Sequence, residues 1–199
     1  MKPFKQFLTE QTADFYHSSF RPRIRYFFPL THIGSYECAV DRLHGLKEYD
    51  PAFKDKTHGF IYKISADTSK SATVKDYYNI ADPNGNGVEK ISKWAEDLLK
   101  DPRIKKGTVE MDGKTFPADN RLKYVRQAID RGWWYDFGDN NNQAAKEFIN
   151  FFIYILESVG ITSLSYTNQV ECAGSTNYII LNPRENIRII GKAKQIPLE

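Results

Sequence analysis

Histidine and carboxylate side chains in three separate segments are the groups of this chain best suited to chemistry. The segments are FYHSS around His17, PLTHIGS around His32, and YTNQVE, which ends at Glu171. Histidine exchanges protons and holds ligands near neutral pH, and a carboxylate stabilises positive charge that develops during a reaction. Each residue also has a plain structural interpretation, since a histidine at a strand end or a glutamate in a turn most often serves the fold.

Considered together, the three segments resemble the ADP-ribosyltransferase superfamily, in its diphtheria-toxin-like and poly-ADP-ribose-polymerase-like branch with a His-Tyr-Glu site. In that branch a strand carries Tyr-His-Gly-Thr/Ser, similar to residues 16–19 here. An element like Thr-His-Phe-Gly then leads into a helix, similar to residues 31–34. Later, a buried helix precedes a strand with Tyr-x-Asn-x-x-Glu, then Gly-Ser and an apolar strand that ends in Asn/Asp-Pro, similar to residues 166–183. The resemblance covers most of residues 12–190 and is weak over 67–135.

The resemblance implies an enzyme that cleaves the bond between nicotinamide and ribose in NAD and transfers ADP-ribose to an acceptor. The transition state resembles an oxocarbenium ion, so Glu171 would stabilise positive charge, bond a ribose hydroxyl and orient the nucleophile. His17 would hydrogen-bond the adenosine-side ribose. His32 stands about where the family has its second-motif tyrosine and is the third catalytic candidate. The protein would supply mainly orientation and electrostatics, because nicotinamide leaves without much acid catalysis.

The resemblance also implies a set of residues that bind NAD, the one cofactor expected: Ser18, Ser19, Thr31, Tyr36 and Tyr62. The backbone at Ser18 would hold the nicotinamide carboxamide, and Tyr36 or Tyr62 would stack on the ring, with a place in the core as the alternative for both. Family members have Gly where this chain has Ser18, whose side chain crowds the carboxamide pocket. Gln169 lies two residues before the glutamate, an offset at which a related branch has a residue that orients the acceptor. Tyr166 and Asn168 would organise the loop.

Other motifs predict no further site. Residues 82–87 match the first half of an EF-hand calcium loop, but Lys93 stands where a bidentate Glu is required. The four histidines lack the HExxH spacing and there is no Cys-x-x-Cys, so no metal site is expected. Arg21, Arg23 and Arg25 form a basic surface run, for which binding of NAD phosphates is the functional alternative.

The periodicity of apolar residues predicts an α+β fold, with an ADP-ribosyltransferase-like split β-sheet and helices packed on it. Strands are predicted at 12–19, 58–66, 74–80, 161–167, 177–181 and 187–190. Phe60, Tyr62 and Ile64 are expected on one face of their strand. Helices are predicted from Gly34-Ser35 to a stop at Gly45, from Val88 to before Pro102, from a cap at Asp119 to before Gly132, and over 143–159. The last helix is apolar nearly all round, which predicts burial.

Composition limits the class of protein. The chain has 199 residues, of which 41% are hydrophobic and 27% charged, a balance that excludes wholesale disorder. It has no apolar run near the ~18 residues of a membrane span, so no membrane partner is expected. A net charge of +3 is too weak to indicate nucleic-acid binding. Two cysteines exclude a disulfide scaffold and are compatible with a reducing compartment. Cys172 is interpreted as an inert small residue.

The first ten residues, MKPFKQFLTE, differ from the rest of the chain. They resemble the capsid-targeting propeptides of internal head proteins in T-even-type bacteriophages, which begin Met-Lys and end in a Leu-x-Glu or Ile-x-Glu processing site. The resemblance implies cleavage after Glu10, which leaves 11–199 as the ADP-ribosyltransferase-like domain. The protein would enter the capsid interior, reside in the virion head and then reach the host cytoplasm.

Three hypotheses from different classes follow. The leading one is a phage-encoded, toxin-like mono-ADP-ribosyltransferase, an enzyme of the glycosyltransferase class, whose acceptor is a host protein or nucleic acid. The second is a non-catalytic internal virion protein or host-factor binder that retains the fold, which the serine in place of glycine motivates. The third is a nuclease-like toxin that acts on nucleic acid, suggested only by the pI of ≈ 8.7 and scattered basic pairs.

Overall fold

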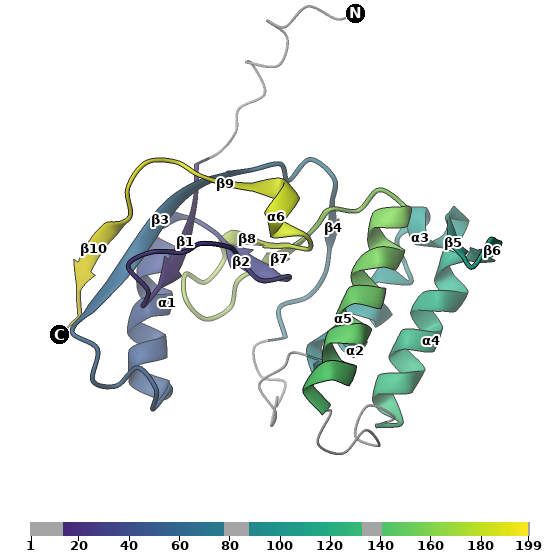
Figure 1. Cartoon of the computed structure of the whole chain (residues 1–199), viewed down its shortest axis with the longest axis horizontal. Coiled ribbons are helices and arrows are strands. Elements are labelled where there is room, and N and C mark those ends of the chain that lie inside the picture. Colours follow the sequence, from purple (N-terminus) through teal and green to yellow (C-terminus); the bar gives the residue numbers. More distant parts are fainter. Residues whose placement is uncertain (1–13, 78–87, 133–140, 199) are drawn as a thin grey trace, which may run out of the picture.

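The computed structural model describes residues 14–77, 88–132 and 141–198, and it has two four-stranded sheets beside a group of helices (Figure 1). Residues 1–10 and the EF-hand-like segment 82–87 lie outside the described residues. The described part is therefore a mixed α/β structure, in agreement with the α+β class. No helix in it is long and apolar enough to cross a membrane.

The first sheet is built around one long strand, which pairs antiparallel with three others. Its members are β1 (Phe15–Ser19), β3 (His58–Ala66), β9 (Ile187–Ile189) and β10 (Lys194–Pro197). The predicted alternation in β3 is confirmed, because Phe60, Tyr62 and Ile64 pack in one hydrophobic cluster. Ile61, on the opposite face, packs with Leu43 of the first helix instead. The strand is therefore covered on both sides.

The second sheet has the order β2-β8-β7-β4, with only β4 and β7 parallel. Its members are β2 (Thr31–Ile33), β4 (Ser71–Thr73), β7 (Ser163–Thr167) and β8 (Thr176–Ile180). The two sheets meet at a bridge between Tyr16 and Gly34, where the backbone nitrogens and carbonyls are 2.8 and 3.1 Å apart. This bridge brings β1 beside β2, so the first two motif segments become neighbours.

Helix α1 (Tyr36–Tyr49) follows β2 directly and begins as predicted, because the hydroxyl of Ser35 accepts a hydrogen bond from the N–H of Cys38 at 3.2 Å. The predicted stop at Gly45 is wrong. A glycine inside a helix costs only about 1 kcal/mol relative to alanine, and the added turn gains a contact, because Nζ of Lys47 donates to the carbonyl of Leu198 at 2.9 Å. The helix therefore continues for one more turn.

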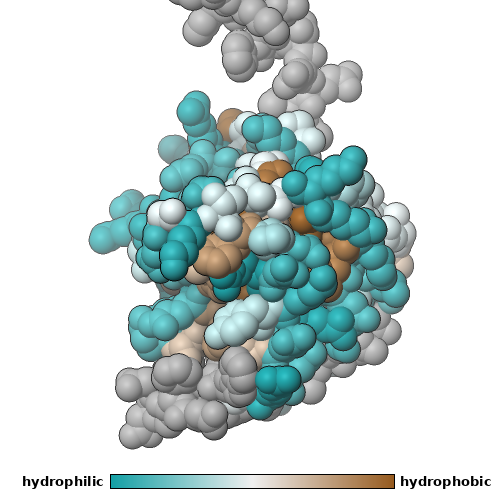
Figure 2. All heavy atoms as spheres, turned by 90° about the vertical axis from the view of Figure 1, so that its right-hand side faces the viewer, coloured by the Kyte–Doolittle hydropathy of each residue, from teal (hydrophilic) through white to brown (hydrophobic). Residues whose placement is uncertain are grey.

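The other helices share the largest hydrophobic cluster with the second sheet. They are α2 (Val88–Leu98), α3 (Pro102–Lys106), α4 (Ala118–Asp130) and α5 (Asn141–Ser158). The short helix α6 (Pro183–Asn186) does not belong to this group. In α5, Phe152 and Leu156 are fully buried while Tyr154 is 44% exposed, so the expected burial on all sides is wrong for one face. Seen from the side of the helices, the surface is largely hydrophilic with small hydrophobic patches (Figure 2).

Several predicted boundaries differ from the structure. Of the strand predicted at 74–80, residues 74–77 form no strand and 78–80 lie outside the described residues. The nearest strand is β4, where residues 71–73 pair with β7. Asp119 does not cap α4; the helix begins one residue earlier and Asp119 pairs with Lys123 in its first turn. The hairpin of β5 (Thr108–Met111) and β6 (Lys114–Pro117), like α3, β2 and β10, was not predicted. The hairpin's turn residues Asp112 and Gly113 both have positive φ.

Candidate functional site

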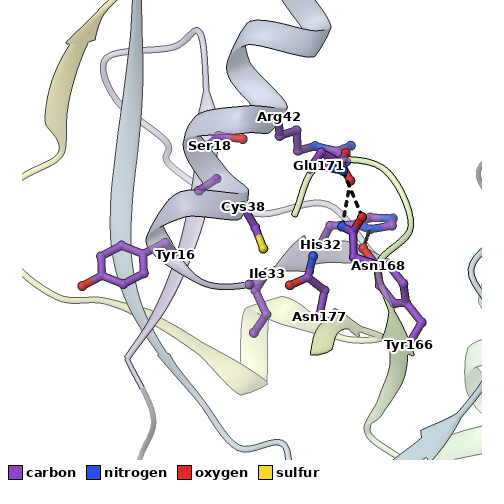
Figure 3. A pocket seen from close by; sticks show the side chains of 12 residues that line it. Tyr16, Ser18, His32, Ile33, Cys38, Arg42, Tyr166, Asn168, Glu171 and Asn177 are labelled. Atoms are coloured by element: carbon purple, nitrogen blue, oxygen red, sulfur yellow. Dashed lines mark hydrogen bonds and ion pairs between the residues drawn. The ribbon is translucent and has the colours of Figure 1, made fainter. Parts of the chain in front are cut away.

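A small pocket lies where β1, β2, α1 and the loop 168–175 between β7 and β8 come together (Figure 3). Its polar lining includes Ser18, His32, Arg42, Asn168, Glu171 and Asn177. We call it the Glu171 pocket. It combines residues from all three motif segments, which are far apart in the sequence. The bridge between β1 and β2 and the pairing of β2 with β8 explain this convergence.

Glu171 is held in the pocket by its own loop. The carboxamide oxygen of Asn168 accepts hydrogen bonds from the N–H groups of Val170 at 2.8 Å and Glu171 at 3.0 Å, which fixes the turn. The amide nitrogen of Asn168 donates to Oε2 of Glu171 at 2.7 Å. Asn168 itself is only 1% exposed. The prediction that Asn168 organises the loop is confirmed.

The second carboxylate oxygen of Glu171 forms an ion pair with Arg42 of α1, with Nη1 and Oε1 3.1 Å apart (Figure 3). The glutamate side chain is 23% exposed, so the carboxylate remains within reach of a ligand. Sequence reasoning missed Arg42. One signal in the sequence could have identified it. Arg42 comes four residues after Cys38, so the two lie on the same face of the helix that follows the second segment.

A disulfide bond joins Cys38 of α1 to Cys172, the neighbour of Glu171, with a Cα–Cα distance of 5.2 Å. This corrects the interpretation of Cys172 as an inert small residue. The two cysteines are 134 residues apart in sequence, so only the tertiary structure brings them together. The bond fastens the loop of Glu171 to the helix that carries Arg42.

His32 is neutral at physiological pH, because burial and the nearby positive charge of Arg42 hold its pKa well below 6.5. Its Nδ1 lies 2.9 Å from the hydroxyl of Tyr166. Burial raises the pKa of Tyr166 to about 12, so the phenol keeps its proton. Where the phenol donates to Nδ1, the neutral imidazole carries its own proton on Nε2.

His17 lies on the other side of β1 from Ser18. Its Nδ1 donates to the backbone carbonyl of His32 at 2.9 Å, and its ring packs edge-on against Phe27. Burial lowers the pKa of His17, although the bond to the carbonyl opposes that shift. His17 therefore lines a neighbouring groove rather than the Glu171 pocket, together with Ser19 and Thr31.

Two buried polar atoms of the pocket have no hydrogen-bond partner among the described residues. They are Oγ of Ser18 and Oδ1 of Asn177, whose residues are 7% and 5% exposed. A buried polar group without a partner costs about 1–3 kcal/mol, so both atoms favour the entry of a ligand that supplies hydrogen-bond donors. Asn177 is a residue that sequence reasoning missed.

The remaining predicted site residues do not line the pocket. Tyr62 is 3% exposed in the core and its hydroxyl donates to the carbonyl of Arg21 at 2.6 Å. Tyr36 packs edge-on against Tyr16 and has Lys194 over its ring. Gln169 is exposed on the loop, and its backbone N–H donates to Asp76. The structure thus unites His32, Ser18 and Glu171, and it leaves both stacking candidates outside.

The pocket is narrow, since the space open to the centre of a water molecule is about 20 Å³, roughly enough for one ordered water. Among residues 14–77, 88–132 and 141–198, no group of His, Cys, Asp or Glu could hold a metal ion. Comparisons with family models, curated proteins and solved structures find no match to this chain.

Proposed function

We propose that this protein is a mono-ADP-ribosyltransferase that cleaves NAD at the nicotinamide–ribose bond and transfers ADP-ribose to a host macromolecule. The observation that carries the proposal is the Glu171 pocket, where the glutamate of the third segment lies with His32 of the second and Ser18 of the first. The meeting of two sheets at the bridge between Tyr16 and Gly34 supports the split-sheet arrangement expected of such enzymes.

The roles follow from the contacts. Glu171 would stabilise the positive charge that develops on the ribose, and the bonds of Asn168 hold its carboxylate ready. Neutral His32 would donate from Nε2 to a polar group of NAD. Arg42 would leave Glu171 when NAD enters and pair with a phosphate, which suits a guanidinium. His17, Ser19 and Thr31 lie outside the Glu171 pocket, in the neighbouring groove, so no contact with NAD follows from their position.

A second candidate function is a non-catalytic internal virion protein or a binder of a host factor. The ion pair between Arg42 and Glu171 favours it, because Arg42 already neutralises the carboxylate that would stabilise positive charge on the ribose. The narrow pocket and the crowding by Ser18 favour it as well.

The test incubates the purified chain with labelled NAD and host lysate, and compares Glu171→Gln with Glu48→Gln, an exposed glutamate at the far end of α1. We expect wild type and Glu48→Gln to release nicotinamide and label a macromolecule, and Glu171→Gln to be slower by about 100-fold or more. Equal turnover by the folded Glu171→Gln variant rejects the role of Glu171. No NAD consumption and no NAD binding by wild type favour the non-catalytic candidate.

A further inference from the structure

Residues 20–30, which connect β1 to β2, combine exposed arginines with exposed aromatic rings. Arg21, Arg23 and Arg25 are all exposed. Tyr26 is 51% exposed and Phe28 61% exposed. An exposed ring is costly to keep in water, and two of them beside three positive charges indicate a surface that binds a partner.

The rings are held in place although the segment has no regular secondary structure. Phe27 is 8% exposed and packs in the core of the first sheet, so Tyr26 and Phe28 on either side of it project outward. The hydroxyl of Thr31 donates to the carbonyl of Phe28 at 2.5 Å. At the other end, the carbonyl of Arg21 accepts a bond from Tyr62. The surface is therefore preorganised, which reduces the entropy lost on binding.

Two cavities run along this segment. One, of about 450 Å³, is lined by the three arginines together with His17, and it has no carboxylate in its lining. The other, of about 660 Å³, lies between Phe28, α5 and α6 and includes Arg184. Both share Tyr26 and Phe28 as lining residues. We call the two together the arginine–aromatic groove, and each half is large enough for a nucleotide.

The positive charge of the groove is not neutralised within the described residues. None of Arg21, Arg23, Arg25 and Arg184 forms an ion pair with a carboxylate there. Arg184 lies 5.8 Å from the centre of the Tyr26 ring. Glu157 is the one acidic residue that the structure places in the lining. The four arginines outnumber this one glutamate, so the lining of the groove has a local excess of positive charge.

We infer that the arginine–aromatic groove binds a single strand of nucleic acid, with phosphates on the arginines and bases stacked on Tyr26 and Phe28. Aromatic rings stack on bases that are unpaired, and arginines follow the backbone. A duplex hides its bases and leaves such rings without a role. The cavity of the arginines shares no lining residue with the Glu171 pocket, but consecutive residues line the two: His17 and Thr31 line the cavity, and Ser18 and His32 line the pocket.

The groove lies close to the Glu171 pocket, so we expect the acceptor of ADP-ribose to be single-stranded nucleic acid. This expectation rests on the proposed transferase function. A strand that continues from the groove past the end of β1 would reach the Glu171 pocket, where NAD would be cleaved, and it would be modified there. Binding of the strand itself does not depend on catalysis, so the two ideas can be tested separately.

The experiment measures the fluorescence anisotropy of labelled 12-nucleotide oligouridylate, oligothymidylate and a DNA duplex of equal length, titrated with the full-length chain at several salt concentrations. We expect both single strands, or one of them, to bind at least 10-fold more tightly than the duplex. A preference between the two identifies RNA or DNA as the natural strand. Equal or tighter binding of the duplex, or no binding of single strands at low salt, overturns the inference.

Two variants examine the groove and one serves as a control. Phe28→Ala should weaken single-strand binding by about 5- to 100-fold with the salt dependence unchanged, because it removes stacking alone. Arg25→Gln should weaken binding and reduce the slope of log affinity against log salt by about 0.7. Tyr49→Ala removes another exposed ring, 78% exposed at the end of α1, and should change nothing. Equal effects of Phe28→Ala and Tyr49→Ala contradict the role of the groove.

The Glu171→Gln variant separates the two proposals. It should bind the strand with wild-type affinity, because Glu171 does not line the groove. NAD cleavage without strand binding would reject only the inference about the groove. Strand binding without NAD cleavage would reject only the proposed transferase.

Discussion

Asn168 is the residue on which the position of Glu171 depends most. It is buried, it fixes the turn through two backbone N–H groups, and it bonds the carboxylate directly. Arg42 completes the arrangement from the facing helix. A carboxylate held by an amide and a guanidinium keeps one orientation, which a catalytic or binding role requires.

His32 gives a pH-dependent stability. Burial, Arg42, Lys90 and His17 hold its folded-state pKa well below 6.5, so below pH 6.5 the unfolded chain takes up a proton that the folded chain does not. The free energy of unfolding should therefore be highest above pH 6.5 and fall as the pH is lowered toward the folded-state pKa. Urea unfolding measured at a series of pH values checks this expectation.

The matched variant for this prediction is His32→Gln, which has no titrating ring. Its free energy of unfolding should depend less steeply on pH between 6.5 and the acid range than that of wild type. The shifted pKa of His17 contributes a slope of the same sign, so some pH dependence remains in the variant. An identical slope in both proteins would show that His32 titrates normally.

At the scale of elements, the contact between β2 and β8 depends on a glycine. A Cβ atom added at Gly34 would lie 2.3 Å from Oδ1 of Asn177, too close for any real pair. Gly34 also forms the backbone bridge to Tyr16 that joins the two sheets. The same residue thus sets the distance between the sheets and the shape of the Glu171 pocket.

Gly34→Ala should lower the free energy of unfolding by about 1–3 kcal/mol, because a buried neighbour must move. Gly45→Ala is the matched control, since nothing lies within 4 Å of its added Cβ and it stands inside α1. That variant should raise stability by about 0.5–1 kcal/mol. Chemical unfolding of the two variants and of wild type measures these free energies. Equal changes in the free energy of unfolding in both variants would contradict the close contact at Gly34.

The disulfide between Cys38 and Cys172 ties two elements that the chain separates by 134 residues. Its loss in Cys38→Ser with Cys172→Ser should lower the free energy of unfolding by about 2–5 kcal/mol, because a long loop is freed in the unfolded state. Amide hydrogen exchange should also become faster in residues 168–175. Unchanged exchange there would mean that Asn168 alone holds the loop. Wild-type protein whose disulfide has been reduced should show the same loss of stability and the same faster exchange.

At the scale of the whole molecule, the site stands at the junction between the two sheets, where β1, β2 and α1 come together (Figure 1). The helices α2, α4 and α5 pack with β7 and β8 in one large cluster, which supports the strands that carry the third segment. The arginine–aromatic groove lies between the first sheet's connection to β2 and the helices α5 and α6. Both proposed sites therefore lie at boundaries between structural layers.

The proposed leader is a prediction about the whole chain and its destination. If residues 1–10 are a capsid-targeting propeptide, mass spectrometry of purified virions should find an N-terminus at Gln11. Glu10→Ala should leave the leader attached, while Lys5→Ala, away from the processing triplet, should still be cleaved. Recovery of intact Met1 from mature particles would reject the propeptide.

Local patterns in the sequence predicted much of the fold. The alternation in HGFIYKISA predicted β3 to the residue, and Ser35 predicted the start of α1, because both signals arise within a few neighbouring residues. The long helix α5 and its end before Gly160, which has a φ of +79°, were also predictable from periodicity and a left-handed glycine. Elements stabilised mainly by distant partners were not: β2, β4 and β10 are three or four residues long and exist because other strands pair with them.

The sequence by itself pointed to His17, His32 and Glu171 as candidates, through three segments that resemble motifs of ADP-ribosyltransferases. Only the tertiary structure decided that His32 and Glu171 share a pocket while His17 lines the groove behind β1. It also decided that Arg42 and Cys38 meet the loop of Glu171. The physical reason is that these contacts join residues more than 100 positions apart, and such pairs are fixed by sheet pairing and core packing, which leave no local pattern in the chain.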